Sequence, residues 1–583
     1  MIEYLYRRFA GLPFTLDHVN GAAAGRVSGA ELRAAIPGLL RSGQLIAMKR
    51  SRDERMYCIP RSVIPVIWEG LKPAAPKAMD GSMARRIKEP GNGLAADLFR
   101  TLSWIGQQGF LPFTSKGTIH RRTIDKLHEI ISLHEEDLSA LGLRYAHQAW
   151  CPLGLAVVLD MLLSLGLLSQ DQDNSFLTVV PEQLSAWLAL DTSEWDTILL
   201  QELLDRYLPD EPGIWHIAYR LVQPDLDTTH WYSTDALLQS LIESGLIPGV
   251  ADREQSWLHG WLSALSAFGW LELGRSPEEN LIFRWCSRPR LKGEFPAAGQ
   301  LGQSEPPEQL EQAEQSGHQH SNPAGETGGR CYVQPDFEIL VPPDVPFHIR
   351  WELECCCECL VNDRMTVYRL TRSRAVHAYQ RGRSPLDLLE LLTSYSHGVP
   401  GNIAQVLTDW EREFRGAERH PLPGKAGQSL ALNERKQPAL SYPRIKPGMH
   451  GSGTFAARRD AAWINQGFRP YLYEPAAEIP GAEELFPGRS RVPSMWIRER
   501  RQYHDSTARS LMDQAMLWRT GVEMNLKSGE CAVFLPMQIS GEHSWMVRGN
   551  LVKGEPQGRH VEEGVLLTPD QWEEIGLLLP LID

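Results

Sequence analysis

The chain has 583 residues, of which 42% are hydrophobic and 22% are charged, values typical of a globular protein with several cores. Its formal net charge of -13 excludes a uniformly basic nucleic-acid coat protein, but it leaves room for a local basic patch. The opening residues are charged too early for a signal peptide, and the longest apolar run, residues 153–168, contains Asp160 and is too short to span a membrane. Nine cysteines without secreted-type spacing indicate a reducing compartment, so we expect a cytoplasmic protein with no membrane partner.

One pattern occurs three times in the first half of the chain: an apolar helix, a glycine, a few apolar residues, a polar turn and a second strand. The copies cover residues 39–60, 162–181 and 265–285. Gly43, Gly166 and Gly269 stand where a helix end requires positive φ. Pro37 lies within the first helix and predicts a split or a kink there.

A helix that leads into a two-stranded hairpin is the second half of a winged helix. We therefore predict tandem winged helices over residues 1–75, 76–190 and 191–294. The alternative is three unrelated helix–hairpin units.

Two stretches lack regular apolar periodicity. Residues 295–329 are rich in Pro, Gly, Gln, Glu and Ser, which predicts a disordered linker. His318 and His320 within it are expected to be solvated. Residues 417–505 contain many prolines, glycines and arginines, and we expect an irregular linker or a segment draped over its neighbours.

Between these stretches, residues 330–416 predict a compact α/β unit. Val333, Phe337 and Ile339 alternate with polar positions as in a strand with one buried face. The expected elements that follow are a helix over 346–361, a strand over 364–370 and helices over 373–381, 385–396 and 401–414. Ser384, followed by a proline and by Asp387, is a good helix start.

Four cysteines crowd into this unit's first helix: Cys355, Cys356, Cys357 and Cys359. Neighbouring cysteines on a helix point about 100° apart, so few of them could share one ion. The chain has no second CxxC or HxxxH pair to complete a zinc site. We therefore expect core cysteines and no metal or other cofactor.

The runs YVQPDFEILVPP, VYRLTRSRAVHAYQRGRSPLDLLELL and VPGNIAQVLTDWEREF resemble the helicase-associated domain at the N-terminus of XPB-type DNA helicases. The marks are Gln334–Phe337, Tyr368–Thr371 and Trp410, and the resemblance covers about 85 residues. It implies a DNA-damage-recognition-like α/β module. Some members of that family carry upstream winged helices and no motor, and this chain looks like one of them.

Residues 506–583 begin with an amphipathic helix that includes Leu511, Ala515 and Trp518, and short strands follow. A helix followed by a small β-barrel-like domain is similar to a WYL-type domain, which would imply binding of nucleic acid or a small ligand. The predicted fold class is therefore multi-domain α+β: tandem winged helices, the XPB N-terminal-like module and this C-terminal domain.

No catalytic motif is present. The chain has no GxxxxGK[ST] run to cradle phosphates, and residues 113–122, FTSKGTIHRR, lack the required glycine spacing. GxSxG, HExxH and Rossmann fingerprints are also missing. We therefore expect no enzymatic activity.

Two basic runs favour binding to DNA phosphates. The first hairpin turn carries Lys49, Arg50, Arg52 and Arg55, as a wing that lies along a duplex would. The second run carries Arg364, Arg369, Arg372, Arg374, Arg381 and Arg383 and has no Asp or Glu between residues 364 and 383. For both runs the alternative is a solvated basic face. The other two hairpin turns are acidic and would repel phosphate.

The sequence thus predicts a non-catalytic DNA-binding or helicase-accessory protein acting in DNA repair or transcription, with DNA and a helicase or the transcription machinery as partners. One alternative is a winged-helix transcriptional regulator whose C-terminal domain senses a ligand. Another is a scaffold whose winged helices bind only protein.

Overall fold

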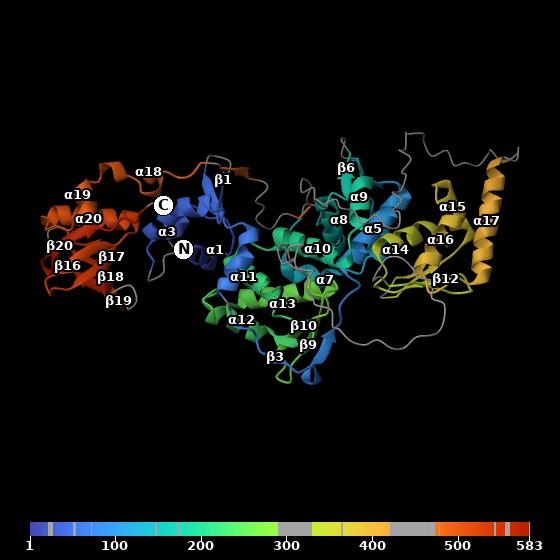
Figure 1. Ribbon diagram of the computed structural model, residues 1–583, viewed down its shortest axis with the longest axis horizontal. Helices are drawn as coiled ribbons and strands as arrows, with labels where there is room; N and C mark the ends of the chain where they lie inside the picture. Colours follow the sequence, from blue (N-terminus) through green and yellow to red (C-terminus); the bar gives the residue numbers. More distant parts are fainter. Residues whose placement is uncertain are drawn as a thin grey trace, which may run out of the picture.

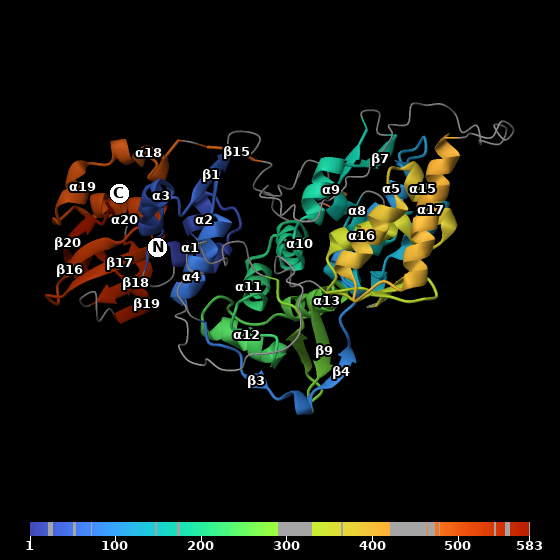
Figure 2. The ribbon, with the colours of Figure 1, turned by 45° about the vertical axis from the view of Figure 1, so that its right-hand side comes forward.

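The protein is a multi-domain α+β molecule whose units follow one another along its longest axis (Figures 1 and 2). The computed structural model describes residues 1–20, 27–49, 54–71, 73–145, 148–171, 175–289, 329–362, 365–419, 463–464, 473–476, 478–541, 544–553 and 560–581. The C-terminal unit lies at one end beside the N-terminal unit, and residues 331–419 lie at the other end. The predicted linker 295–329 falls, apart from Gly329, outside the described residues.

The N-terminal unit is a small helical bundle with a hairpin. Its elements are α1 (Ile2–Phe9), α2 (Leu16–Asn20), α3 (Gly29–Arg41), β1 (Ile46–Lys49), β2 (Arg55–Cys58), η1 (Arg61–Val63) and α4 (Ile64–Leu71). Phe14 bridges Tyr57 and so adds a short strand between α1 and α2. Ser28 starts α3 with a capping box to Glu31. Of the split or kink expected at Pro37, the split is wrong, because α3 runs unbroken through this residue.

The second unit repeats the order of a helix, a strand, more helices and a hairpin. Its elements are α5 (Leu94–Gln108), β5 (Leu111–Pro112), α6 (Arg121–Ile130), α7 (Glu135–Leu138), η3 (Ser139–Leu141), α8 (Leu153–Ser164), β6 (Leu168–Gln170), β7 (Phe176–Val179) and α9 (Pro181–Leu188). The three strands form an antiparallel sheet in the order β5-β7-β6. Helix α10 (Thr192–Tyr207) then leads to the third unit.

The third unit has a larger sheet, because strands from an earlier segment join it. Its own elements are α11 (Pro212–Leu221), β8 (Trp231–Ser233), α12 (Thr234–Glu243), α13 (Asp252–Ala267), β9 (Leu271–Arg275) and β10 (Leu281–Trp285), and the added ones are β3 (Ala78–Met79), η2 (Gly81–Met83) and β4 (Arg85–Lys88). The strand order is β3-β8-β10-β9-β4. Residues 78–88, which the sequence grouped with 76–190, therefore complete the sheet of the third unit. Gly43, Gly166 and Gly269 all have positive φ, as predicted.

The 331–419 unit consists of four helices and a four-stranded antiparallel sheet. Its elements are β11 (Tyr332–Val333), β12 (Glu338–Val341), α14 (Phe347–Cys356), β13 (Glu358–Asn362), β14 (Thr366–Arg369), α15 (Arg372–Gln380), α16 (Pro385–Tyr395) and α17 (Gly401–Arg419). The sheet order is β11-β12-β14-β13. Ser384 caps α16 in a capping box with Asp387, as the sequence indicates.

Two predicted elements of this unit need correction. The single strand expected through Val333 and Ile339 is a hairpin, because Phe337 takes positive φ in a turn between β11 and β12. The helix expected to reach residue 361 ends at Cys356. Cys357 is extended, and the residues after it pair with β14 as strand β13, which places Cys359 opposite Tyr368. Tertiary strand pairing therefore overrides the local helical pattern.

The C-terminal unit is a helix on an open five-stranded antiparallel sheet. Its elements are α18 (Ala482–Leu485), η5 (Arg489–Arg491), α19 (Ser494–Arg498), α20 (Asp505–Trp518), β16 (Val522–Leu526), β17 (Cys531–Ser540), β18 (Met546–Lys553), β19 (His560–Leu567), η6 (Pro569–Gln571) and β20 (Trp572–Leu577). The sheet order is β19-β18-β17-β16-β20, so β19 and β20 are opposite edges and the described strands do not close into the expected barrel. Part of the stretch predicted as an irregular linker, residues 478–503, belongs to this unit.

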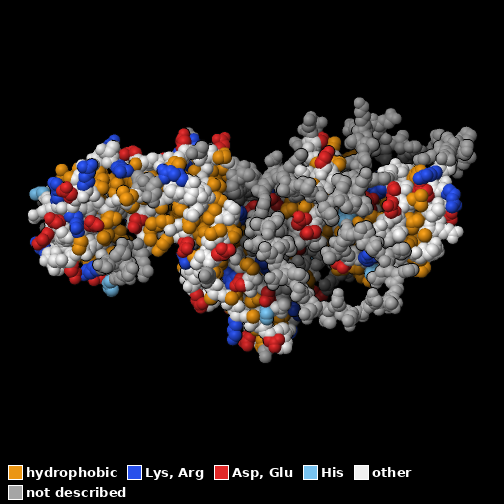
Figure 3. All heavy atoms as spheres, viewed as in Figure 1, with side chains coloured by type: hydrophobic (Ala, Val, Ile, Leu, Met, Phe, Trp, Pro, Cys, Tyr) orange, Lys and Arg blue, Asp and Glu red, His pale blue; other side chains and the backbone are white. Residues whose placement is uncertain are grey.

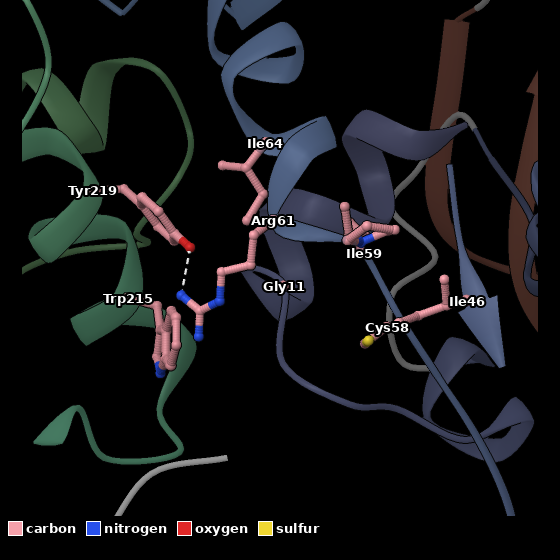
Figure 4. A pocket seen from close by; sticks show the side chains of 9 residues that line it. Gly11, Ile46, Cys58, Ile59, Arg61, Ile64, Trp215 and Tyr219 are labelled. Atoms are coloured by element: carbon pink, nitrogen blue, oxygen red, sulfur yellow. Dashed lines mark hydrogen bonds between the residues drawn. The ribbon is translucent and has the colours of Figure 1, made fainter. Parts of the chain in front are cut away.

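Arg61 joins the N-terminal unit to the third unit. Its guanidinium stacks over the ring of Trp215 at 4.4 Å and donates to the Tyr219 hydroxyl at 2.8 Å, both on α11 (Figure 4). It also forms an ion pair with Asp205 of α10 at 2.6 Å. Beside it lies a cavity of about 170 Å³, lined in part by Ile59 and Ile64. One arginine thus fixes the N-terminal unit against two helices.

Asp160, in the middle of the apolar helix α8, is fully buried and accepts hydrogen bonds from two other segments. Arg206 donates from Nη2 at 2.6 and 2.7 Å, and the Tyr207 hydroxyl donates at 3.0 Å. The backbone N–H groups of Trp463 and Ile464 donate to Oδ1 at 2.7 and 2.9 Å. The carboxylate therefore holds α8, α10 and the chain that returns from the 331–419 unit.

No helix within the described ranges has the length and apolarity needed to cross a membrane.

We expect Asp160→Asn to destabilise the second unit by about 3–5 kcal/mol, because it removes the carboxylate that pairs with the buried guanidinium of Arg206. The measurement is urea unfolding followed by tryptophan fluorescence. Asp125→Asn on the exposed face of α6 removes the same charge and serves as the control. An unchanged unfolding midpoint for Asp160→Asn would contradict the central role of this carboxylate.

Candidate nucleic-acid interface

The predicted wing of the N-terminal unit does not present a free basic surface among its described residues. Lys49 ends β1 and Arg55 begins β2, whereas Arg50 and Arg52 lie outside the described residues. Arg55 donates to both carboxylate oxygens of Glu484 at 2.8 Å and lies 3.3 Å from Glu478. Its side chain is only 15% exposed. The charge of Arg55 is therefore neutralised by a segment more than four hundred residues away.

That same segment also covers the edge of the hairpin. Strand β15 (Glu474–Pro475) pairs with β1, which sets Glu474 opposite Lys49. A hollow of about 540 Å³ opens beside this sheet. Its charged lining consists of Asp17, Lys49, Glu54, Arg55 and Glu484. With three carboxylates against two cations, the hollow does not suit a phosphate group.

Helix α3 stands where a winged helix would place its DNA-reading helix, but it is covered. The backbone N–H of Ala30 donates to the carbonyl of Arg519 at 3.2 Å. Arg33 donates to the carbonyl of Trp518 and lies over the ring of Phe486 at 5.1 Å. Burial lowers the pKa of Arg33. The C-terminal unit therefore covers α3 at Ala30 and Arg33.

The corresponding helices of the next two units are also covered. All twelve residues of α8 are buried. In α13 the exposed residues are confined to Asp252, Arg253 and Ser256 near its start. The hairpin turns that follow carry acidic residues, and Glu279 in the third unit is paired with Arg85 at 2.8 Å. Neither α8 nor α13 therefore presents a free face along its length that could enter a groove.

The arginine run of the 331–419 unit is also engaged, mostly by residues distant in sequence. Arg369 pairs with Glu338 at 2.6 Å, Arg372 pairs with Glu413, and Arg383 pairs with Glu352 at 2.6 Å. Arg383 is only 4% exposed, whereas Arg369 and Arg372 are 48% and 58% exposed. Carboxylates outside 364–383 therefore offset the local positive charge that the run predicts.

Two more arginines of the run hold the unit in place. Arg374 donates to the side-chain oxygen of Gln107 at 3.3 Å, and Arg381 donates to its backbone carbonyl at 3.0 Å. Gln107 lies near the end of α5, so these contacts join the 331–419 unit to the second unit. Arg364 lies outside the described residues.

An aromatic contact forms the centre of this junction. Phe347 of α14 stacks on Trp195 of α10 with ring centroids 4.1 Å apart and an interplanar angle of 6°. Trp351 meets Phe99 of α5 edge-on at 5.8 Å. Nearby, Arg100 lies 3.8 Å from the buried carboxylate of Glu354, whose pKa is raised by burial. A packed aromatic centre with an ion pair beside it indicates a stable junction.

The four clustered cysteines belong to the core of the 331–419 unit and its border. Cys356 and Cys357 are buried beside Ile349 and Leu353, and Cys359 receives a contact from Arg100 at 3.5 Å. Burial raises the pKa of all four thiols, which keeps them protonated at neutral pH. Within the described residues, no three His, Cys, Asp or Glu side chains gather as a metal site would require. His318 and His320 lie outside them.

Sequence reasoning missed a different basic segment. Residues 488–501 carry five arginines, which the sequence assigned to an irregular linker. The available signal was their alternation with Val492, Trp496 and Ile497, three residues that pack against the core of the C-terminal unit.

We expect two of the nine thiols, Cys286 and Cys531, to react quickly with a thiol reagent in the native protein, because only these two are exposed. The other seven should react only after denaturation, since burial disfavours their thiolates. A colorimetric thiol titration with and without denaturant measures both numbers. Fast reaction of Cys355–Cys357, or one zinc ion per chain lost in a Cys355→Ala/Cys359→Ala variant, would contradict the core assignment.

Comparison with known families gives one match. Residues 331–432 match a family model described as helicase conserved C-terminal domain. No curated protein sequence matches the chain. The match covers the 331–419 unit and supports a helicase-associated domain there, so the protein is related to helicases through this part of the chain.

Proposed function

We propose that this is a non-catalytic, DNA-binding helicase-accessory protein that acts in DNA repair or transcription. The observation that carries the proposal is the helicase conserved C-terminal domain match at 331–432 in a chain that has no GxxxxGK[ST] run. The four-stranded sheet of the matched unit is antiparallel throughout. Phosphate-binding loops of motor proteins follow a strand and open a helix, and this unit's sequence offers no glycine-rich loop of that kind.

The finer family assignment is part of the same proposal. The upstream units each follow the order of a helix, a short strand, further helices and a hairpin, which supports tandem winged helices. The marks quoted for the XPB-type resemblance fall within the matched unit. For the C-terminal unit, a helix on an antiparallel sheet supports the WYL-like interpretation at the level of topology alone.

A second function, a protein scaffold, is favoured by one specific observation. Helices α3, α8 and α13 use nearly all of their faces for contacts inside the chain. A winged helix whose helix before the hairpin is buried has to bind its partners through other surfaces. Recovery of the tagged protein with and without nuclease separates the two functions: a motor ATPase that accompanies it supports the accessory role, and nuclease-resistant partners without DNA affinity support the scaffold.

The accessory proposal includes a DNA contact on the 331–419 unit. Arg369 and Arg372 are the described members of the arginine run that combine high exposure with only one carboxylate partner each. A phosphate could replace Glu338 or Glu413 in those pairs, because guanidinium groups bind carboxylate and phosphate with the same geometry.

We expect the purified protein to hydrolyse no ATP, with or without DNA, because the phosphate-cradling loop is missing. A coupled phosphate-release assay measures this, and a known helicase added to the same reaction serves as the positive control. DNA-stimulated turnover that persists through further purification would refute the non-catalytic role.

We expect Glu338→Gln combined with Glu413→Gln to strengthen binding to duplex DNA, because both arginines lose the carboxylates that compete with phosphate. The plot of log K against log salt should steepen by about 0.9 for each arginine that gains a phosphate contact. Fluorescence anisotropy on plain and forked duplexes measures it. The control, Glu278→Gln in the third unit, removes a carboxylate far from this surface, and an equal gain there would contradict the assignment.

A further inference from the structure

The segment from Gly488 to Arg501 is the most basic described part of the C-terminal unit. It contains Arg489, Arg491, Arg498, Arg500 and Arg501, against a single carboxylate, Glu499, and no lysine. In Figure 3, Lys and Arg side chains lie on the surface at this end of the molecule, interspersed with Asp and Glu side chains. On a chain with a net charge of -13, such a segment forms a local positive surface.

The backbone of this segment is held firmly. The carboxylate of Glu483 accepts from the N–H groups of Gly488 at 2.8 Å and Ser490 at 3.1 Å. At the other end, Arg501 and Ile575 exchange two backbone hydrogen bonds of 3.1 and 3.0 Å, which extends the sheet beyond β20. Val492, Trp496 and Ile497 pack against the core between these anchors, and Tyr503 packs against it just after the second one. The arginines are therefore carried on a preorganised scaffold.

The five arginines differ in whether their side chains have a partner within the protein. Arg501 pairs with Glu499 at 2.5 Å, and Arg500 contacts Asn525 and Cys531 at 3.2 and 2.7 Å. The side chains of Arg489, Arg491 and Arg498 meet no hydrogen-bond acceptor or carboxylate among the described residues. Arg491 and Arg498 are exposed and Arg489 is half-exposed. Of the two acidic residues shortly before them, Glu484 pairs with Arg55 and Glu483 accepts from backbone N–H groups.

We infer that Arg489, Arg491 and Arg498 form a contact surface for the phosphate backbone of duplex DNA, an inference that rests on the proposed DNA-binding function. Guanidinium groups bind phosphate oxygens in a bidentate manner, and a rigid backbone lowers the entropy lost on binding. Contacts to phosphates alone position a duplex and carry no sequence information. The surface lies at the opposite end of the molecule from the 331–419 unit (Figures 1 and 2), so the protein has a second DNA contact remote from its helicase-associated domain.

The test compares two triple variants of the full chain. The first is Arg489→Gln/Arg491→Gln/Arg498→Gln. The control is Arg85→Gln/Arg253→Gln/Arg412→Gln, which removes the same charge from three exposed arginines that are paired with Glu279, Glu211 and Asp409. Anisotropy titrations use a labelled duplex at several salt concentrations, and circular dichroism checks that both variants keep the wild-type thermal unfolding. We expect the slope of log K against log salt to become shallower by about 0.9 per lost phosphate contact in the first variant and to stay unchanged in the control.

Each other outcome overturns a separate statement. If the wild type binds no duplex, the proposed DNA-binding function fails and this inference with it. If the wild type binds duplex and the first variant behaves as the control does, the function stands and this surface is excluded. If the first variant binds duplex normally but loses flotation with vesicles of equimolar phosphatidylcholine and phosphatidylserine, the surface binds anionic lipid. If instead it loses only a co-purifying acidic protein, the surface is a protein interface.

Discussion

The path of the whole chain depends on the buried carboxylate of Asp160. A charge with no access to water must be surrounded by donors, and here these come from α10 and from the N–H groups of Trp463 and Ile464. The chain that leaves the 331–419 unit is thereby brought back across the second unit. It next pairs with the hairpin of the N-terminal unit through β15 and then enters the C-terminal unit.

This return path explains why the N-terminal unit is covered on two sides. Strand β15 and Glu484 neutralise its hairpin, and the end of α20 covers α3 through Ala30 and Arg33. The hairpin and the helix α3, whose counterparts contact DNA in a winged helix, are therefore used here for contacts between units. A surface buried in this way contributes to stability and domain placement, so the DNA contacts that we propose lie on other surfaces of the molecule.

Local features of the fold were predictable from the sequence because their causes are local. The helix ends at Gly43, Gly166 and Gly269 require positive φ, and Ser384 with Asp387 forms a capping box; both signals occupy only a few residues. The helix through the cysteines was extended too far, because the strand β13 is fixed by pairing with β14 rather than by its own pattern. Strands β3 and β4 join the sheet of the third unit from about 150–190 residues away, and no periodicity within 78–88 reveals that partner.

The candidate site was less predictable for the same physical reason. The absence of Asp and Glu between residues 364 and 383 suggested free charge, yet Glu338, Glu352 and Glu413 approach from other elements. A count of charges along the chain measures the composition of a segment and cannot include partners that the fold supplies. The segment 488–501 shows the opposite case. Its apolar residues pack against the core, Glu499 pairs with Arg501, and Glu483 accepts from backbone N–H groups, so these carboxylates do not pair with Arg489, Arg491 or Arg498. Whether an arginine is available to phosphate is therefore decided by the carboxylates that folding places beside it, and this availability can be read only from the assembled chain.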